Sequence, residues 1–347
     1  MNAIVRESQF EEGGHNIELG DLSSNRLKQD ALLFEQFGES LAVAHHDYHS
    51  LDLFSDDALI ELLTHFPRRR LQCFTMGQDL AKPEEWQAVC VRGVNGADLF
   101  EAVKNGRLWI NVTNIDHHDD RYRRLVTDMY AQVESLCPTV ENPGLYYNTL
   151  VLASPDTQFY YHANPENNML WNMRGELTLK SLPALDFRFL SQQLLEEIFA
   201  NEASGTIPYS HEFAQFAESV SVGADQCAWW PQTAPIHMQY HSFCVSLVTS
   251  YFCPMRQRRA NVQLANRYLL RSLGIGNRSI AEHGVSSELK QLVFRTIRRC
   301  FATRKSYDFT DSYLTNLKVN LSEPQALEEL DHVLIPEFSK YSEMLYS

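Results

Sequence analysis

Histidines are the residues of this chain whose types and spacing first suggest chemistry. His45, His46 and His49 lie close together in sequence, and His117 and His118 directly precede two aspartates. Both groups look like metal ligands, but the first is predicted to lie in a loop. The second is predicted to begin a helix, where acidic residues favour the positive end of the helix dipole. We therefore interpret both as structural. The sequence contains no phosphate-binding loop, G-x-S-x-G elbow or dinucleotide fingerprint.

The segment from Tyr146 to Pro254 has the sequence pattern of an all-β fold. Short stretches of aromatic and β-branched residues alternate there with turn residues, as in a barrel or a sandwich. One helix, at about 189–200, interrupts the series. The expected strands are 146–153, 158–162, 169–173, 177–182, 219–222, 227–230 and 243–252.

Amphipathic helices are predicted on both sides of this β segment. Before it, a helix at 58–65 is capped by Ser55-Asp56-Asp57, a second runs from 96 to 105, and a third starts after Asp120. After it, helical spacing covers 262–273, 289–301 and 325–334. The β segment should therefore be buttressed by helices and followed by a helical region.

Two sequence segments, F-Y-Y-H-A-N-P-E-N-N-M-L-W-N-M-R-G-E-L-T-L and G-A-D-Q-C-A-W-W-P-Q-T-A-P-I-H-M, resemble one known family. Both are similar to motifs of the cupin-like, jumonji-C branch of the iron(II)- and 2-oxoglutarate-dependent oxygenases, whose bacterial members are related to asparaginyl hydroxylases. The stretch A-V-K-N-G-R-L-W-I-N-V resembles a segment that precedes the barrel there. The resemblance implies a double-stranded β-helix (cupin, or jelly-roll) barrel.

The resemblance also implies positions for the iron ligands, which in the family are two imidazoles and one carboxylate. His162 takes the first histidine position, and Asn164 takes the carboxylate position with a neutral amide. The second histidine would follow Pro235, where this chain has Ile236, and His237 comes one residue later. Because neighbouring side chains of a strand point to opposite faces, His237 should face away from His162 unless a β-bulge turns it back.

The family's co-substrate site is altered in the same selective way. A lysine that pairs with 2-oxoglutarate in many relatives is replaced by Leu177, and Lys180 lies three residues further along. The other matching positions belong mostly to the scaffold of the barrel: Asn168, Arg174, Gly175, Trp230, Pro231 and Pro235. Together with Ile236, several of these should line the pocket. The scaffold positions match the family, whereas the positions for the iron ligands and for the co-substrate lysine differ from it. This combination favours a barrel that does not carry out the oxygenase reaction.

Charge is distributed unevenly along the chain. The net charge of −14 argues against a general nucleic-acid binder, because neutralising phosphates requires clustered Lys and Arg. Residues 255–306, however, hold twelve Lys and Arg against two Glu. This basic block either neutralises acidic surface within the protein or contacts RNA, a ribosome or an acidic protein. The seven cysteines form no C-x-x-C pair, and no apolar run could span a membrane. We expect free thiols and a cytoplasmic protein.

These observations predict a mainly β protein with flanking helices. The expected parts are a loose arm (1–40), a helical and stranded buttress (41–145), the barrel (146–254) and a helical C-terminal region (255–347) that forms a homodimer. Three functions stay open. The first is a degenerate oxygenase relative that binds a small molecule or peptide in the barrel. The second is an active iron(II)/2-oxoglutarate hydroxylase using His162, Asn164 and His237, and the third is a regulatory protein acting through its basic helices.

Overall fold

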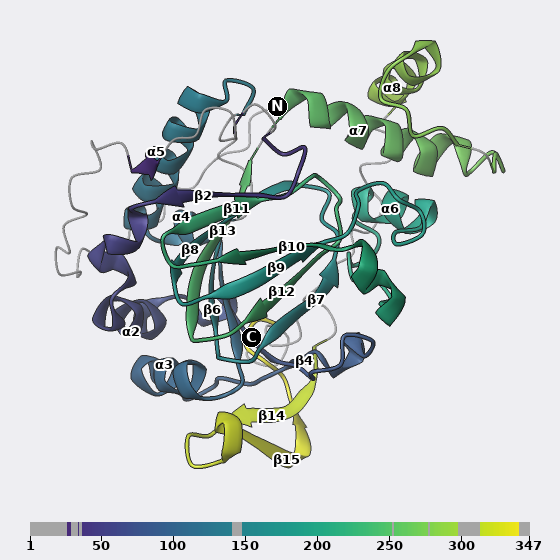
Figure 1. Ribbon diagram of the computed structural model, residues 1–347. Helices are drawn as coiled ribbons and strands as arrows, with labels where there is room; N and C mark the ends of the chain where they lie inside the picture. The colour runs from purple at the N-terminus through teal and green to yellow at the C-terminus, as the bar shows by residue number, and fades with distance from the viewer. Residues whose placement is uncertain are drawn as a thin grey trace.

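The computed structural model describes residues 26–28, 34, 37–140, 148–251, 253–276, 278–297 and 313–339. Its centre is a pair of antiparallel sheets that face each other (Figure 1). Eight consecutive strands are divided between the two sheets, and each step along the chain crosses from one sheet to the other except the step from β9 to β10, which pair within the smaller sheet. They are β6 (Thr149–Ala153), β7 (Gln158–His162), β8 (Asn167–Arg174), β9 (Leu177–Ser181), β10 (Glu218–Val222), β11 (Gln226–Trp229), β12 (Ile236–Tyr240) and β13 (Cys244–Tyr251).

The strand order identifies the topology. The larger sheet contains the order β11-β8-β13-β6, and the smaller sheet has the order β10-β9-β12-β7. Successive strands that cross between two sheets in this sequence form a jelly roll, so the expected cupin-like arrangement is present. Among the described residues, however, no hydrogen-bonded ladder joins the two sheets. The structure is therefore a two-sheet sandwich, and the expected closure into a barrel is not observed.

The buttress extends the larger sheet on both sides. Strands β1 (Leu27–Lys28) and β2 (Ala42–His46) continue it beyond β11, while β5 (Trp109–Thr113), β3 (Leu71–Thr75) and β4 (Gln87–Ala88) continue it beyond β6. Helices α2 (Asp56–His65), α3 (Gly96–Asn105) and α5 (Asp120–Leu136) lie on one side of the sandwich, and the short α4 (Ile115–His118) precedes α5 (Figure 1). All three long helices were predicted, and Ser55, Asn95 and Asp119 cap them through their side chains.

Alternation along the strands builds two apolar layers. On β8, Met169, Trp171 and Met173 join the helices in one core, whereas Leu170 faces the smaller sheet. Between the sheets lie Leu177 and Leu179 of β9 and other buried residues, among them Trp109, Val222, Ala228, Trp230, Met238 and Tyr240. Each sheet residue is thus assigned to a face by its position along a strand.

The C-terminal region begins as predicted and then departs from the prediction. Helix α7 (Pro254–Ala265) continues into one π-helical turn (Asn266–Leu270), and α8 (Val285–Ile297) packs against α7. Helix α6 (Gln192–Phe199) lies beside α7. The predicted helix at 325–334 is wrong, because strand β15 (Leu327–Leu334) pairs there with β14 (Thr315–Val319). The residues E-E-L-D-H-V fit a helix by spacing, but the pairs that Glu328, Glu329 and Leu334 make with β14 hold the two ends of this segment in a strand.

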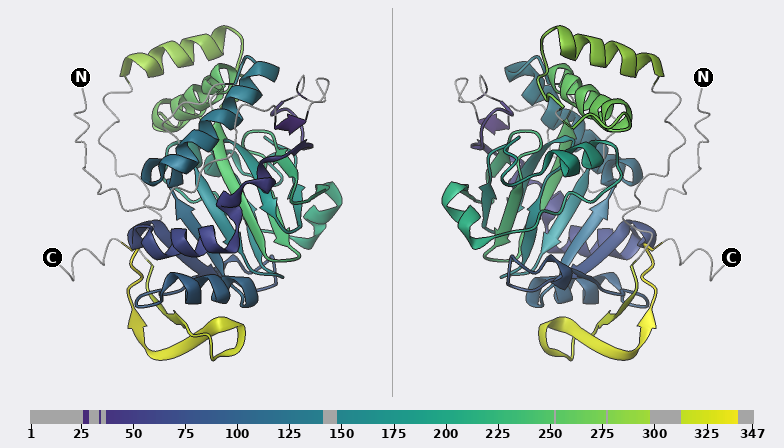
Figure 2. Two further views of the ribbon diagram at one scale, coloured as in Figure 1. Left: turned by 90° about the vertical axis from the view of Figure 1, so that its left-hand side faces the viewer. Right: turned by 90° about the vertical axis from the view of Figure 1, so that its right-hand side faces the viewer.

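Two other expectations concern the ends and the surface of the chain. Most of the predicted loose arm, 1–40, lies outside the described residues, but its described part is packed: Leu27, Phe34 and Phe37 are buried, and both phenylalanine rings contact Trp229. The α7–α8 pair and the β14–β15 hairpin lie at opposite ends of the molecule (Figures 1 and 2). Among the described helices, none is long and apolar enough to cross a membrane.

Candidate functional site

One row of residues crosses the smaller sheet at the end where His162 lies. Glu218 of β10 pairs with Ser181 of β9, Ser181 pairs with Ile236 of β12, and Ile236 pairs with His162 of β7. Directly paired residues of an antiparallel sheet point to the same face. Because Ile236 belongs to the layer between the sheets, this row forms the inner rim of the jelly roll. We call this end the mouth.

A β-bulge decides which way His162 points. Met238 pairs with Phe159, and two residues along β12 Ile236 pairs with His162, so β7 contains one extra residue between the two pairs. In a regular strand, positions 159 and 162 would face opposite sides. The bulge puts both on the inner face, and their rings lie 5.4 Å apart. This bulge lies in β7 and turns His162 inward, so it is not the bulge considered from the sequence, which would have turned His237.

His237 lies on the other face of the smaller sheet. It pairs with Lys180 between two inward residues of the regular strand β12, and its ring packs against Tyr161 at 5.4 Å. Its Nδ1 donates to the Phe159 carbonyl at 2.8 Å, which fixes the tautomer of a neutral ring. Burial lowers the pKa of His237 to about 4. The structure therefore does not bring His237 to His162.

Protein atoms crowd the imidazole of His162, although part of the residue reaches the surface. Residues 205–207 run antiparallel to the end of β7, where Gly205 O accepts from Ala163 N and Ile207 N donates to Tyr161 O, both at 2.9 Å. A Cβ on Gly205 would lie 2.7 Å from Nε2 of His162. Burial lowers the pKa of His162 to about 4, partly offset by a hydrogen bond with Asn164. The ring is neutral near pH 7, and the backbone of Gly205 covers its Nε2 edge.

The asparagines and the nearby glutamate have separate roles. Asn164 contacts His162, and Asn168 accepts from Ser250 Oγ at 3.0 Å inside the sandwich. Glu166 was not predicted as part of the site, yet burial raises its pKa. Gly205 was also not predicted, because nothing in its local sequence indicates which strand it meets. The carboxylate of Glu166 is the acid nearest in sequence to His162 at this end.

Apart from Arg174, the residues predicted for the co-substrate region are spread over two environments. Leu177 is fully buried between the sheets opposite Tyr240, and Trp230 and Ile236 are buried in the same layer. Lys180 pairs with His237 on the outer face. These placements put no cation beside Leu177.

Arg174 leaves the interior because of a second bulge. β8 has one extra residue opposite the Val245–Ser246 step of β13, which turns Arg174 toward the helices. There Arg174 binds Asp56 of α2 at 2.5 Å and lies over the Phe243 ring at 5.2 Å. Lys104 of α3 binds the same aspartate at 2.8 Å. Arg174 thus holds the buttress to the sheet, and it does not face the mouth.

Taken together, these side chains do not fit iron(II) and 2-oxoglutarate. Two imidazoles and a carboxylate on one face would be needed. The structure offers one imidazole beside a neutral amide, with its Nε2 edge against Gly205. A dicarboxylate would also meet Leu177 instead of a cation, and burying an unpaired carboxylate is costly. Throughout the described ranges, no group of three or more His, Cys, Asp or Glu side chains is placed to hold a metal ion.

Five of the twelve basic residues of the block meet carboxylates within the same chain. Ion pairs join Arg258 to Glu288, Arg259 to Glu282, Arg267 to Glu202, Arg271 to Glu197 and Arg278 to Glu196. Three of these glutamates come from α6 and the turn after it. Internal neutralisation therefore accounts for these five arginines. Arg298, Arg299, Arg304 and Lys305 lie outside the described residues.

Comparison with known proteins gives one kind of match. No protein-family model and no curated protein sequence matches the chain. Among solved structures, YcfD of Escherichia coli is similar at 12% identity and a TM-score of 0.44, with 81% of this chain and 70% of that chain covered. A structure described as YcfD, a ribosomal oxygenase, in complex with cobalt and 2-oxoglutarate is similar at 10% identity and a TM-score of 0.42. Because these identities and TM-scores are low, the fold assignment rests on the strand order and register described above.

Proposed function

We propose that this chain is a member of the jumonji-C oxygenase superfamily that binds a small molecule or a peptide at its mouth without iron(II)/2-oxoglutarate turnover. The observation that carries the proposal is the setting of His162. A bulge turns this residue inward, but its partners there are Asn164, Ile236 and the backbone of Gly205. The frame of an oxygenase site is kept, and the groups that would hold metal and co-substrate are replaced.

A cavity at the same end supports a binding role. It has a volume of about 350 Å³ and lies where β9 ends and β10 begins. Apolar Leu182, Leu185 and Pro231 line it together with Ser181, Glu218 and other residues. Ser181 and Glu218 belong to the row that ends at His162. Apolar walls with a few polar groups are typical of ligand sites of this size.

The test compares this cavity with a filled version of itself. A library of small polar fragments is screened by ligand-observed NMR against the wild type and against Ser181→Trp, with Ser219→Trp on the outer face as the matched control. We expect fragments that bind the wild type and the control but not Ser181→Trp. Binding that is identical for all three proteins would contradict the mouth as the site. Steady conversion of 2-oxoglutarate to succinate would favour the active hydroxylase instead.

We further propose that α8 mediates a homodimer. Val285, Leu289 and Leu292 are 88%, 59% and 63% exposed and lie on one helical stripe with Val293. Such a stripe on a helix at the end of the molecule is typical of a helix–helix interface. Glu288 lies in the first turn and Arg295 in the last turn of α8. An antiparallel second copy would therefore bring opposite charges together across a two-fold axis.

Light scattering tests the dimer. We expect a mass near two chains of 40.0 kDa for the wild type and near one chain for Leu289→Asp/Leu292→Asp. Leu321→Asp, an exposed leucine after β14, is the control and should stay dimeric. A wild-type mass near one chain at micromolar concentration would contradict this proposal. RNA or ribosome contact through the undescribed end of the basic block would appear as binding that the α8 substitutions leave unchanged.

A further inference from the structure

Residues 330–333 of strand β15 do not pair with β14, and we call this stretch the arch. Thr315 pairs with Leu334, yet the next pair joins Leu317 to Glu329. Only Asn316 therefore lies opposite residues 330–333. An ordinary bulge has one extra residue, and larger ones are features that redirect a strand. The arch leaves Val333 63% exposed and lifts its backbone away from β14.

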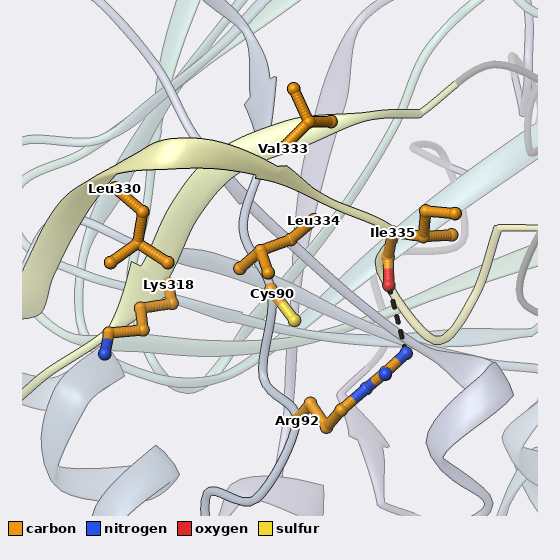
Figure 3. A pocket seen from close by; sticks show the side chains of 7 residues that line it. All are labelled: Cys90, Arg92, Lys318, Leu330, Val333, Leu334 and Ile335. Atoms are coloured by element: carbon orange, nitrogen blue, oxygen red, sulfur yellow. Dashed lines mark hydrogen bonds between the residues drawn. The ribbon is translucent and has the colours of Figure 1, made fainter.

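The arch roofs a cavity of about 340 Å³. Figure 3 shows Leu330, Leu334 and Ile335 on the hairpin side of this cavity, with Cys90 at its centre on the opposite segment. The floor is fixed, because Cys90 N donates to Leu317 O at 2.9 Å and Val319 N donates to Cys90 O at 3.2 Å. The cavity thus lies between two parts of the chain that are far apart in sequence. Its size is within the range of small-molecule sites.

Two cations lie at the ends of this apolar cavity. Lys318 lies beside Leu330, and Arg92 lies beside Ile335 (Figure 3). Lys318 Nζ binds Glu328 at 3.1 Å, and Arg92 Nη2 donates to Ile335 O at 3.3 Å. An ammonium has three donors and a guanidinium has five, so either group can bind a carboxylate in addition to the partners that it already has. The long bond from Arg92 is also one that a carboxylate could replace.

We propose that this cavity binds an aliphatic monocarboxylate. The hydrocarbon chain would lie against Leu330, Leu334 and Ile335, and the carboxylate would bind Arg92 or Lys318. An uncharged aliphatic molecule would leave the cations without a new acceptor, and an aliphatic amine would be repelled by them. This site lies on the β14–β15 hairpin and is independent of the function proposed for the mouth.

Cys90 gives a direct readout in the full-length protein. Its thiol lines the cavity and this residue is 4% exposed, whereas Cys137 is half-buried directly after α5 and serves as the control in the same chain. Alkylation by iodoacetamide is followed by peptide mass spectrometry with octanoate, octylammonium or octanol. We expect octanoate to slow the labelling of Cys90 most and to leave Cys137 unchanged. Equal slowing of both cysteines, or equal protection by octylammonium, would overturn the proposal.

Calorimetric titration with octanoate provides the second measurement. Either Arg92→Gln or Lys318→Gln, whichever removes the cation that binds the carboxylate, should weaken binding by about fivefold, the loss expected for one partly exposed ion pair. Lys82→Gln removes the same charge from an exposed lysine that pairs with Glu85 at 3.7 Å, and should leave binding unchanged. Binding that neither Arg92→Gln nor Lys318→Gln weakens, or no binding by the wild type at millimolar octanoate, would overturn the proposal.

Discussion

At the mouth, His162 and His237 lie on opposite faces of the smaller sheet, and neither meets a carboxylate in the contacts described above. In the layer of α6, α7 and α8, by contrast, Glu196, Glu197 and Glu202 each meet an arginine. Both regions bury ionisable side chains. In the first, burial lowers the pKa of each histidine to about 4 and the rings stay neutral. In the second, each carboxylate has an arginine as its ion-pair partner.

The comparison shows two ways to bury an ionisable group. A lone group gives up its charge, since desolvation disfavours the charged form. A paired group keeps its charge but makes each partner depend on the other. The mouth should therefore respond to pH, and the helical layer should respond to the loss of one partner.

The largest expected effect is in the helical layer. Glu196 is fully buried, and its Oε1 accepts from Arg278 at 2.7 Å. Glu196→Ala should lower the free energy of unfolding by about 3 kcal/mol, because it leaves a largely buried arginine without its carboxylate. Glu197→Ala is the matched control, since its pair with Arg271 is more exposed, and should cost less than about 1 kcal/mol. Urea unfolding measures both. Equal losses would show that burial does not distinguish these pairs.

The next effect is the pH dependence at the smaller sheet. His237 has a folded pKa of about 4 against an ordinary value of 6.5, so the unfolded state binds more protons between these values. Stability from this group is complete above pH 6.5 and is lost as pH falls toward 4. His237→Gln should therefore remove about 2 kcal/mol of the stability loss between pH 7 and pH 5. His211→Gln, at an exposed histidine, should change nothing. An unchanged pH profile in His237→Gln would contradict the buried neutral ring.

A smaller effect is expected from rebuilding the metal ligands. Wild-type protein should bind nickel(II) weakly, and Asn164→Asp alone should change this little, because His237 faces away. Asn164→Asp/Ile236→His places a carboxylate and a second imidazole on the face of His162. It should raise affinity at least about tenfold, since even supporting groups of metal sites are worth that much. Calorimetry compares the variants. Stoichiometric metal bound by His162 and His237 in the wild type would contradict the face assignment.

The smallest expected signal is turnover. Because Leu177 is buried where a co-substrate cation would be needed, succinate formation from 2-oxoglutarate should not exceed that of His162→Ala. The measurement is a succinate assay with added iron(II). Activity above this control would mean that another residue, such as Lys180 or Arg174, reaches the ligand. Such a result would require that side chain to leave the position that it has in this structure.

Sequence alone determined the elements that depend on local patterns. Alternating apolar residues located seven of the eight jelly-roll strands, and helical spacing located α2, α3 and α5, with a predicted cap at Ser55 for α2. The motif around His162 also identified the candidate positions for the iron ligands. Strand β12 was not among the expected strands, although I-H-M-Q-Y alternates apolar and polar residues as a half-buried strand does.

Tertiary structure decided everything that depends on pairing. One extra residue in β7 turns His162 inward, one in β8 turns Arg174 outward, and several in β15 make a cavity where a helix was predicted. Gly205 reaches His162 from more than forty residues away along the chain. A shift of one residue in register exchanges the faces of a strand at no cost in local propensity. The sequence could therefore name the site residues, but only the packed sheets determined which of them meet.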